Sequence, residues 1–328
     1  MRLIVAFVVS VVVPGYGSAA AGRLAAGIAI AVAAAACHLA CGVTPWALLA
    51  LLAVRIASGV HAAIARRRRG AFDWFAAPAL AVGVASVCAG GLLRLGVTDP
   101  FRVPSSGMAP TLLPGDHIFV ERLRLLVRGP ERGDPVVFHY PCAERDYIKR
   151  VVAVGGDTVE VRCGVVYVNG AAAPQSLVAA HDEYDDLDEY HSTWEPTKVA
   201  RYRETLGGHD YELFFNEGRD PQQPGLRDFP AANAELPSCA SSIDGGAQGE
   251  PLGAFVDAKP AAAGDCAPHR AYRVPAGYFF ALGDDRDNSN DSRVFGPVAN
   301  DAAFGLASGI WLSSGAHGVT LSRVGHVP

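Results

Sequence analysis

The chain has 328 residues, of which 50% are hydrophobic and 19% charged, and its formal net charge is −5. This length leaves room for about two domains. The acidic balance excludes a nucleic-acid partner, because the one dense basic cluster is the run Arg66–Arg69. The hydrophobic excess is concentrated before residue 98, which indicates a membrane protein.

Apolar runs fill the first 98 residues and predict an α-helical transmembrane region. Residues 3–13 stop at Pro14, short of the roughly 20 residues that a bilayer takes, so we interpret them as an apolar half-helix, with a cleavable secretory signal as the alternative. Three longer runs are each long enough to span: residues 24–41, 45–63 and 72–97. The positive-inside rule places the Arg66–Arg69 loop in the cytoplasm, which predicts a multi-pass protein of the cytoplasmic membrane with everything after residue 98 on the outer face.

From residue 99 onward, apolar residues alternate with polar ones or form short β-branched clusters, which is typical of strands. Turn signals such as Gly155-Gly156-Asp157 and Asn169-Gly170 separate them. Strands are expected at five places: Asp116–Glu121, Asp134–Tyr140, Asp146–Val154, Thr158–Val161 and Val165–Val168. The predicted fold class is a mainly β domain preceded by an α-helical transmembrane region.

Residues 171–270 differ in composition and are interpreted as an inserted smaller domain between two parts of a β core, residues 99–170 and 271–328. The insert contains a Pro/Gly/Ala-rich tract and the acidic run Asp182–Glu189, which is read as a solvated surface rather than a cation site. Within the insert, a hairpin is predicted around Gly207-Gly208.

Three of the seven cysteines lie in apolar runs, where they act as small hydrophobes: Cys37, Cys41 and Cys88. The remaining four allow three pairings in an oxidising compartment: Cys142, Cys163, Cys239 and Cys266. Cys239–Cys266 is preferred because both belong to the insert. No pair has Cys-x-x-Cys spacing, so neither a metal site nor another cofactor is expected.

Residues 101–116, with the sequence FRVPSSGMAPTLLPGD, directly follow the membrane part. Three prolines and Gly115 predict an ordered, largely non-helical loop that displays Ser105 and Ser106. The composition of this stretch by itself fits an ordinary linker equally well.

Lys149 lies in the strand-like sequence YIKRVV, where alternation places it on the face of Val151 and Arg150 on the opposite face. A lysine buried on an apolar face has a lowered pKa and can act as a general base near neutral pH. The alternative is a surface lysine whose ammonium reaches water.

Residues 283–296, GDDRDNSNDSRVFG, form a third polar segment with many Asp and Asn residues. Alternating acidic residues also begin calcium-binding loops, but no glutamate follows at the required offset. We therefore interpret the segment as a polar loop built for another purpose.

These three segments resemble, in order, the nucleophile, lysine and Gly-Asp boxes of the type I signal peptidases, which are membrane-bound Ser-Lys dyad proteases. The resemblance covers about residues 99–170, part of the insert and residues 272–313. It implies a serine endopeptidase that removes N-terminal signal peptides from exported preproteins after a small-x-small motif. Its partners would be those preproteins and membrane lipid.

The resemblance also implies roles for individual residues. Lys149 would be the general base that takes the serine proton, Ser105 would belong to the oxyanion hole, and Ser289 would orient Lys149. Asp291 and Arg293 would form a supporting ion pair. The substrate-binding walls would include six side chains: Phe101, Val103, Met108, Leu112, Tyr147 and Ile148.

Two positions depart from the family pattern. Gly107 stands where the family has its nucleophilic serine, and Ser106 lies one place earlier; Asp285 replaces an asparagine. Ser106 is the candidate nucleophile if Gly107 lets the loop twist toward Lys149, since simple alternation would turn it away. The alternative is an inactive homologue that binds signal peptides or scaffolds export.

Two other classes compete less well. A self-cleaving Ser-Lys protease similar to the SOS repressors would carry a DNA-binding helical domain in place of the apolar runs. A Ser-His hydrolase could draw on the ten histidines, but the Gly-x-Ser-x-Gly elbow is absent.

Overall fold

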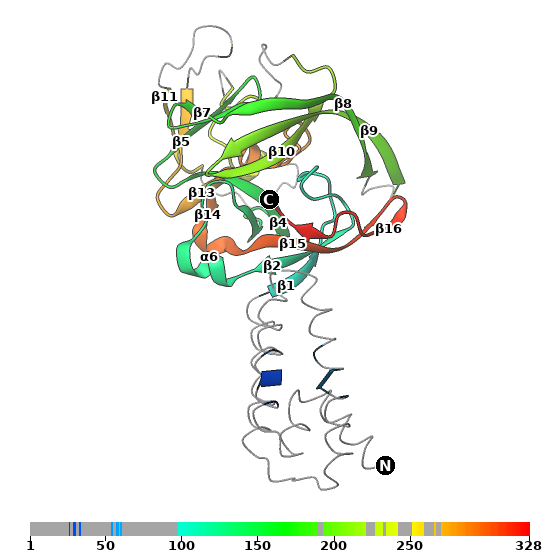
Figure 1. Cartoon of the computed structure of the whole chain (residues 1–328). Coiled ribbons are helices and arrows are strands. Elements are labelled where there is room, and N and C mark those ends of the chain that lie inside the picture. Colours follow the sequence, from blue (N-terminus) through cyan, green and yellow to red (C-terminus); the bar gives the residue numbers. More distant parts are fainter. Residues whose placement is uncertain are drawn as a thin grey trace. The chain divides into compact units, whose positions relative to one another are not determined.

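A computed structural model of the chain describes residues 98–188, 193–220, 227–231, 234–241, 251–258, 266 and 270–328, together with residues 26, 29, 30, 33, 54, 57, 58 and 60 (Figure 1). Apart from those isolated positions, the predicted transmembrane segments lie outside the described residues. Within the described part, no helix combines the length and the hydropathy needed to cross a membrane.

Strands dominate the described residues, so the domain after residue 98 is mainly β, as the alternating pattern predicted. The five expected strands are confirmed to within two residues as β2 to β6. The strands are β1 Thr98–Arg102, β2 Asp116–Glu121, β3 Pro135–His139, β4 Asp146–Val154, β5 Thr158–Arg162, β6 Val165–Val168, β7 Ala171–Ala172, β8 Gln175–Asp188, β9 Thr193–Leu206, β10 His209–Asn216, β11 Ala254–Asp257, β12 Arg270–Arg273, β13 Tyr278–Leu282, β14 Val298–Ala299, β15 Ala303–Gly315, β16 Gly318–Thr320 and β17 Gly325–His326. The helices are α6 Leu123–Arg128, η1 Cys239–Ser241, α7 Ser292–Phe295 and η2 Asn300–Ala302.

The chain divides into two units, Met1–Asp99 with Val324–His326 and Pro100–Arg323 with Val327–Pro328. The second unit contains three antiparallel sheets. One runs in the order β2-β15-β3-β4-β13-β14, with β16 paired to β15; the others run β11-β12-β5-β6-β7 and β10-β9-β8.

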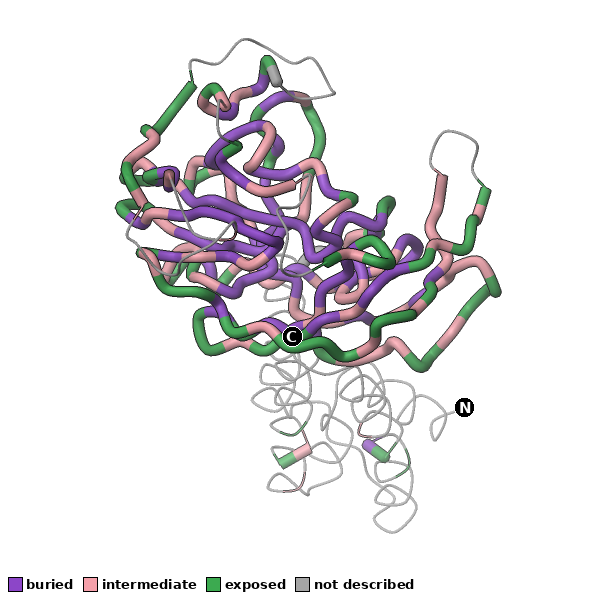
Figure 2. Tube along the Cα trace, turned by 90° about the horizontal axis from the view of Figure 1, so that it is seen from above, coloured by how far each residue is buried: buried purple, intermediate pink, exposed green. Residues whose placement is uncertain are grey.

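Strand β4 lies inside the largest sheet, between β3 and β13, and is buried along most of its length. In the part of the chain after residue 98, buried segments gather in the interior and exposed ones lie along the outside (Figure 2). Val152 packs in one hydrophobic cluster with residues of β9, β10 and β13, while Val151 packs in another with β3 and α7. Because both faces of β4 are covered, a charged side chain on either face is buried and is costly unless it pairs or loses its charge. This is the strand that carries Lys149.

The stretch 171–270 contributes β7 to β11, including the whole of the third sheet. The predicted hairpin is confirmed: β9 and β10 pair across Gly207-Gly208, whose φ angles are +62° and +84°. The acidic side chains of the run Asp182–Glu189 that the structure describes are exposed or half-buried, as expected of a solvated surface, but one neighbour is not. Residues 182–188 of this run form the end of β8, and Tyr184 among them is only 8% exposed. Side chains alternate along a strand, so a single apolar position within an acidic run can still face the interior.

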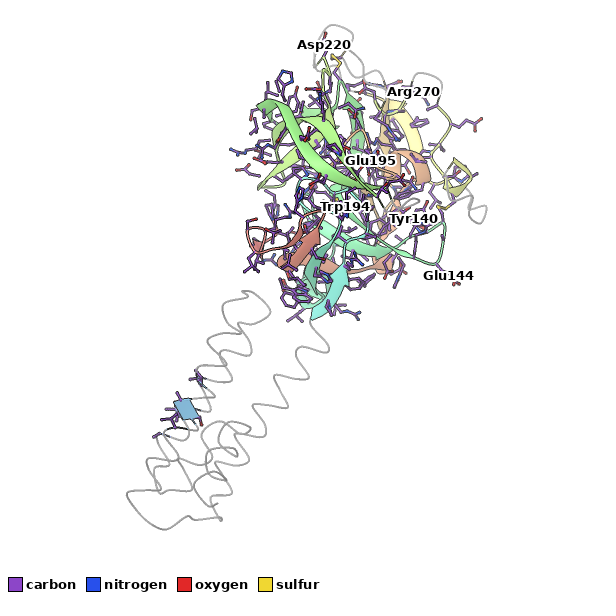
Figure 3. All side chains as sticks on the ribbon, turned by 90° about the vertical axis from the view of Figure 1, so that its right-hand side faces the viewer. Tyr140, Glu144, Trp194, Glu195, Asp220 and Arg270 are labelled. Carbon is purple, nitrogen blue, oxygen red and sulfur yellow. A yellow bond between two sulfur atoms is a disulfide. The ribbon has the colours of Figure 1, made fainter. Side chains whose placement is uncertain are left out.

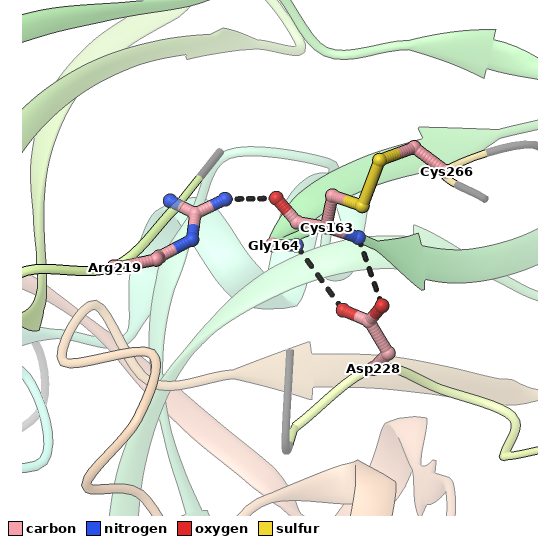
Figure 4. The surroundings of a disulfide bond; sticks show 5 residues. All are labelled: Cys163, Gly164, Arg219, Asp228 and Cys266. Carbon is pink, nitrogen blue, oxygen red and sulfur yellow. Dashed lines mark hydrogen bonds between the residues drawn. A yellow bond between two sulfur atoms is a disulfide. The ribbon is translucent and has the colours of Figure 1, made fainter. Parts of the chain in front are cut away.

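The preferred cysteine pairing, Cys239–Cys266, is wrong. The bridges are Cys142–Cys239 and Cys163–Cys266, with Cα–Cα distances of 5.2 and 5.5 Å. Each bridge joins the strands before residue 171 to the 171–270 stretch, because the chain brings the β3–β4 and β5–β6 connections next to distant segments. Asp228 fixes the second bridge by accepting from Cys163 N–H and Gly164 N–H at 2.9 and 3.1 Å (Figure 4).

Candidate active site

The loop between β1 and β2 is closed by its own backbone. Val103 N–H donates to the Asp116 carbonyl at 2.8 Å, and Gly115 N–H donates to the Val103 carbonyl at 2.9 Å. Inside the loop, Ala109 N–H donates to the Ser106 carbonyl at 2.6 Å. No helix forms between residues 103 and 115, as the prolines predicted. The loop therefore holds Ser105 and Ser106 in fixed positions.

A buried ion pair ties this loop to β4 and to the loop after β13. Arg150 donates from Nε and Nη2 to the two carboxylate oxygens of Asp284, at 2.9 and 2.7 Å. Thr111 Oγ1 donates to Asp284 Oδ2 at 2.5 Å. Arg150 also lies over the ring of Tyr211, 3.8 Å from its centroid. Both charged side chains are fully buried, so removing one alone would leave an uncompensated charge.

Lys149, the neighbour of Arg150 in β4, is 6% exposed. Burial lowers the pKa of Lys149, whereas the carboxylates of Asp291, Asp284 and Asp285 act against that shift. The Lys149 amine makes no hydrogen bond to the residues that the structure describes. A buried amine with a lowered pKa is neutral in a larger fraction of molecules and can then accept a proton.

Residue 107 faces this amine. A Cβ built on Gly107 would lie 2.6 Å from Lys149 Nζ and 3.8 Å from Ser289 Oγ. A side chain on Gly283 would overlap the Gly107 carbonyl oxygen, so the two loops approach this closely because residue 283 is also a glycine. The position that meets the lysine therefore carries no hydroxyl in this chain.

Ser106 has other neighbours. Its buried hydroxyl accepts a hydrogen bond from Asn288 Nδ2 at 3.3 Å, and it interacts with the Tyr184 hydroxyl. In the described part of the chain no hydrogen bond joins Ser106 to Lys149. Ser105, next to it, is exposed.

The other predicted residues lie in the loop after β13. Arg293 donates to both oxygens of Asp291, at 2.8 and 2.7 Å, and Asp291 also accepts from Gly283 N–H at 3.1 Å. Burial alone would raise the pKa of Asp291, but Arg293, the Gly283 N–H and Lys149 together outweigh it, and the pKa is lowered. Ser289 Oγ is buried without a hydrogen-bond partner among the described residues, so its bond to Lys149 stays a prediction.

Three of the four predicted catalytic residues, Ser105, Ser106 and Lys149, line one pocket of about 370 Å³ together with Asn288. Ser289, the fourth, is not part of its lining. Three residues predicted to contact substrate also line it: Met108, Tyr147 and Ile148. The other three are not part of its lining: Val103 and Leu112 are buried in the core beside Met108, and Phe101 packs half-buried against them.

Two stacked tyrosines stand beside this pocket. The rings of Tyr140 and Tyr147 are parallel with centroids 4.1 Å apart, and Asn290 Nδ2 lies 3.4 and 3.3 Å from their hydroxyls. Tyr140 is buried, whereas Glu144, in the same β3–β4 connection, is exposed (Figure 3). The connection therefore supplies a rigid aromatic wall on its inner side.

Sequence reasoning missed two residues at the site, Tyr184 and Asn288. It also did not predict that Asp285 is buried. Tyr184 donates to Asp285 Oδ2 at 3.0 Å and arrives from β8, within a run that reads as solvated. The departure of Asp285 from the family pattern was the one available signal. The alternation along β8 would have identified Tyr184 only if that run had been read as a strand.

Comparison with known proteins identifies the class of molecule. The family model described as "Signal peptidase, peptidase S26" matches residues 72–312. The signal peptidase I of Aquifex aeolicus is 31% identical over 231 residues, covering 67% of this chain and 78% of that protein. The signal peptidase I of Pseudomonas aeruginosa is 28% identical over 246 residues, covering 68% and 67% respectively.

The chain therefore belongs to the signal peptidase family, peptidase S26. Within that family it is similar to the type I signal peptidases, as the order of the three boxes predicted. A solved signal peptidase I from Enterococcus faecalis V583 covers 55% of this chain and 98% of that chain at 21% identity, with a TM-score of 0.27.

Proposed function

We propose that this chain is a serine endopeptidase that removes N-terminal signal peptides from exported preproteins, with Ser106 as nucleophile and Lys149 as general base. One observation carries the proposal: in a chain of this family, a serine hydroxyl and a buried lysine with a lowered pKa line the same pocket. In this mechanism Ser106 Oγ attacks the scissile carbonyl, and water later releases the acyl group.

The remaining residues support that reaction. Ser105 contributes a hydroxyl to the oxyanion hole beside a backbone N–H, which stabilises the charge that develops on the carbonyl oxygen. Ser289 orients Lys149. The Asp291–Arg293 pair fixes the loop that carries Ser289.

The substrate and location follow from the pocket and the sequence. Met108 and Ile148 line a cavity of about 370 Å³, which suits small side chains before the cleaved bond. The apolar runs before residue 98 anchor the enzyme as a multi-pass protein in the cytoplasmic membrane, with membrane lipid as a further partner. The catalytic domain then lies on the outer face, where exported preproteins emerge.

Gly107 favours a second candidate, an inactive homologue that binds signal peptides or scaffolds export. A Cβ built on Gly107 would lie 2.6 Å from Lys149 Nζ, so the position that meets the lysine lacks a hydroxyl, and Ser106 bonds to Asn288 instead. A serine at 107 displaces only the flexible end of the lysine, so the Gly107→Ser substitution is sterically mild.

The test is a preprotein cleavage assay with the purified full chain in detergent. The proposal predicts that the native chain cleaves the preprotein and that Ser106→Ala and Lys149→Ala each abolish cleavage. Lys198, an exposed lysine in β9, is the control, and Lys198→Ala should cleave as the native chain does. A native chain that is inactive, combined with Lys149-dependent cleavage by Gly107→Ser, would establish the second candidate instead.

A further inference from the structure

The connection between β3 and β4 supplies part of the lining of the pocket of about 370 Å³. Arg145 lies at the end of this connection and Tyr147 at the start of β4, and both line the pocket. The connection turns tightly, since Tyr140 N–H donates to the Arg145 carbonyl at 2.9 Å and Arg145 N–H donates to the Ala143 carbonyl at 2.8 Å. The shape of the pocket on this side therefore depends on what holds the turn 140–145 in place.

A disulfide bond holds this turn. Cys142, in the middle of the turn, is bonded to Cys239 of η1, and the two residues are only 5% and 7% exposed. The short helix η1 packs in turn against α7. A side chain on Gly296, at the end of α7, would lie 2.7 Å from the Pro237 carbonyl oxygen, so the segment before η1 also approaches α7 closely. The bridge therefore fastens the turn to η1 and α7.

Aromatic rings connect this fixed turn to the pocket. Tyr140 belongs to the same hydrophobic cluster as the bridge, and its ring meets Phe295 of α7 edge-on, with centroids 5.1 Å apart. The ring of Tyr140 also stacks on Tyr147, with centroids 4.1 Å apart. Asn290, which lines the pocket as well, lies 3.4 and 3.3 Å from the hydroxyls of the two tyrosines. Tyr147 and Asn290 thus form one wall of the pocket, and Tyr140 supports that wall.

The stiffness of a wall decides how well a pocket rejects a larger side chain. Packed aromatic rings yield little, because one ring can move only if its neighbours move with it. A surface connection between two strands is more mobile when nothing ties it down. A cross-link in the middle of the connection removes that freedom. The wall then keeps its position when a bulky substrate residue enters.

We propose that the Cys142–Cys239 bridge determines specificity: it holds the wall formed with Tyr140 and Tyr147 against α7, so that the pocket admits only a small substrate side chain. This inference rests on the proposed function and assigns a selectivity role to a bond outside the pocket. Cys142 and Cys239 are positioning residues, since neither belongs to the pocket lining and both act through Tyr140.

The experiment compares two synthetic signal-peptide substrates that differ only in the residue before the cleaved bond, alanine in one and valine in the other. The ratio of their kcat/KM values measures the selectivity of the pocket. In the native chain the alanine substrate should be preferred by more than about 10-fold. In Cys142→Ala/Cys239→Ala this ratio should fall by at least about fivefold, because the valine side chain can displace a loosened wall. A bridge that served only overall stability would lower both kcat/KM values and leave their ratio unchanged.

The second disulfide provides the matched control. Cys163–Cys266 has a sequence separation of 103, against 97 for Cys142–Cys239, so its removal should cost a similar amount of stability. Neither of its cysteines lines the pocket. Cys163→Ala/Cys266→Ala should therefore keep the native ratio to within about twofold.

Tyr140→Leu tests the same wall with the bridge intact, and it serves if the double cysteine variant does not fold. Leucine removes the stack on Tyr147 and the hydroxyl beside Asn290, so the ratio should fall as it does without the bridge. A lowered ratio in Tyr140→Leu with a native ratio in the folded double cysteine variant would assign selectivity to the rings alone and overturn the role of the bridge. Thermal unfolding of each variant checks that the fold is retained.

The outcomes separate the two proposals. If the native chain cleaves through Ser106 and loss of the Cys142–Cys239 bridge leaves the ratio unchanged, or if the control loses it equally, the bridge does not set selectivity and the proposed function stands. If the native chain does not cleave, the proposed function fails. The affinities of the two peptides for the same chains, measured by fluorescence anisotropy, then decide the role of the bridge through the same ratio. A chain that binds neither peptide would overturn both proposals.

Discussion

At the scale of single residues, the region of the site contains two buried ionisable groups, Lys149 and Asp285. The pKa of Lys149 is lowered and the pKa of Asp285 is raised. Burial favours the neutral amine of Lys149 and the neutral acid of Asp285. Both shifts have the same physical origin, since a low-dielectric environment penalises whichever form is charged. Lys149 lines the pocket, where its neutral amine can accept a proton, whereas Asp285 is not among the pocket's lining residues.

Lys149→Arg tests the requirement for a neutral base. Arginine keeps the positive charge but does not deprotonate, so steady-state cleavage should fall by about 10²–10⁴-fold, as much as in Lys149→Ala. In the native chain, turnover should rise with pH as the neutral fraction of Lys149 grows. An arginine variant with near-native kcat would refute the base role, and Lys198→Arg serves as the control.

Asp285→Asn tests the buried carboxyl group through stability. The folded-state pKa is about 7, above the roughly 3.9 of an unfolded aspartate, so between these values the folded chain holds a proton that the unfolded chain has released. Stability from this group is therefore lost as pH rises from about 4 to about 7. At pH 8 the Asn variant should be more stable by up to about 4 kcal/mol, and at pH 4 the advantage should vanish.

Urea unfolding at pH 4 and pH 8 measures this difference, with the exposed Asp301→Asn as control. An advantage of equal size at both pH values would show that the effect is packing and not ionisation.

At the scale of elements, the strands were predictable but their contacts were not. Alternation located β2 to β6 and the β9–β10 turn, because those signals are local in sequence. Arg150 was assigned correctly to the face opposite Lys149, yet nothing local showed that this face is also buried, against Tyr211 of the third sheet. Likewise, nothing local in the sequence of β8 showed that Tyr184 is buried against Asp285.

The disulfides illustrate this limit of local sequence signals most clearly. Cys142 and Cys239 are 97 residues apart, and their pairing depends on which loops the fold brings together. Cross-links that close loops of this length stabilise a chain by about 2–5 kcal/mol. The double variant Cys142→Ala/Cys239→Ala should therefore unfold at lower urea than the native chain. Unchanged stability would contradict a native bridge at this position.

At the scale of the whole molecule, the orientation in the membrane is a prediction from the Arg66–Arg69 run and the apolar runs around it. A thiol reagent that cannot cross the membrane should label a cysteine introduced at the exposed His181 in intact spheroplasts. A cysteine beside Arg67 should react only after lysis. Labelling at 181 only after lysis would reverse the orientation and remove the assignment to exported substrates.

The central claim is that Ser106 forms the covalent intermediate even though Gly107 occupies the family's nucleophile position. The most direct test is to mix the full chain with an activated ester of a signal-peptide acyl group, quench within the first turnover, and locate the added mass by peptide mapping. Lys149→Ala should form the adduct more slowly, because the base that takes the serine proton is missing. The account predicts the acyl group on Ser106; an acyl group on Ser105 or Thr111, or continued cleavage with no acylated residue, would contradict it.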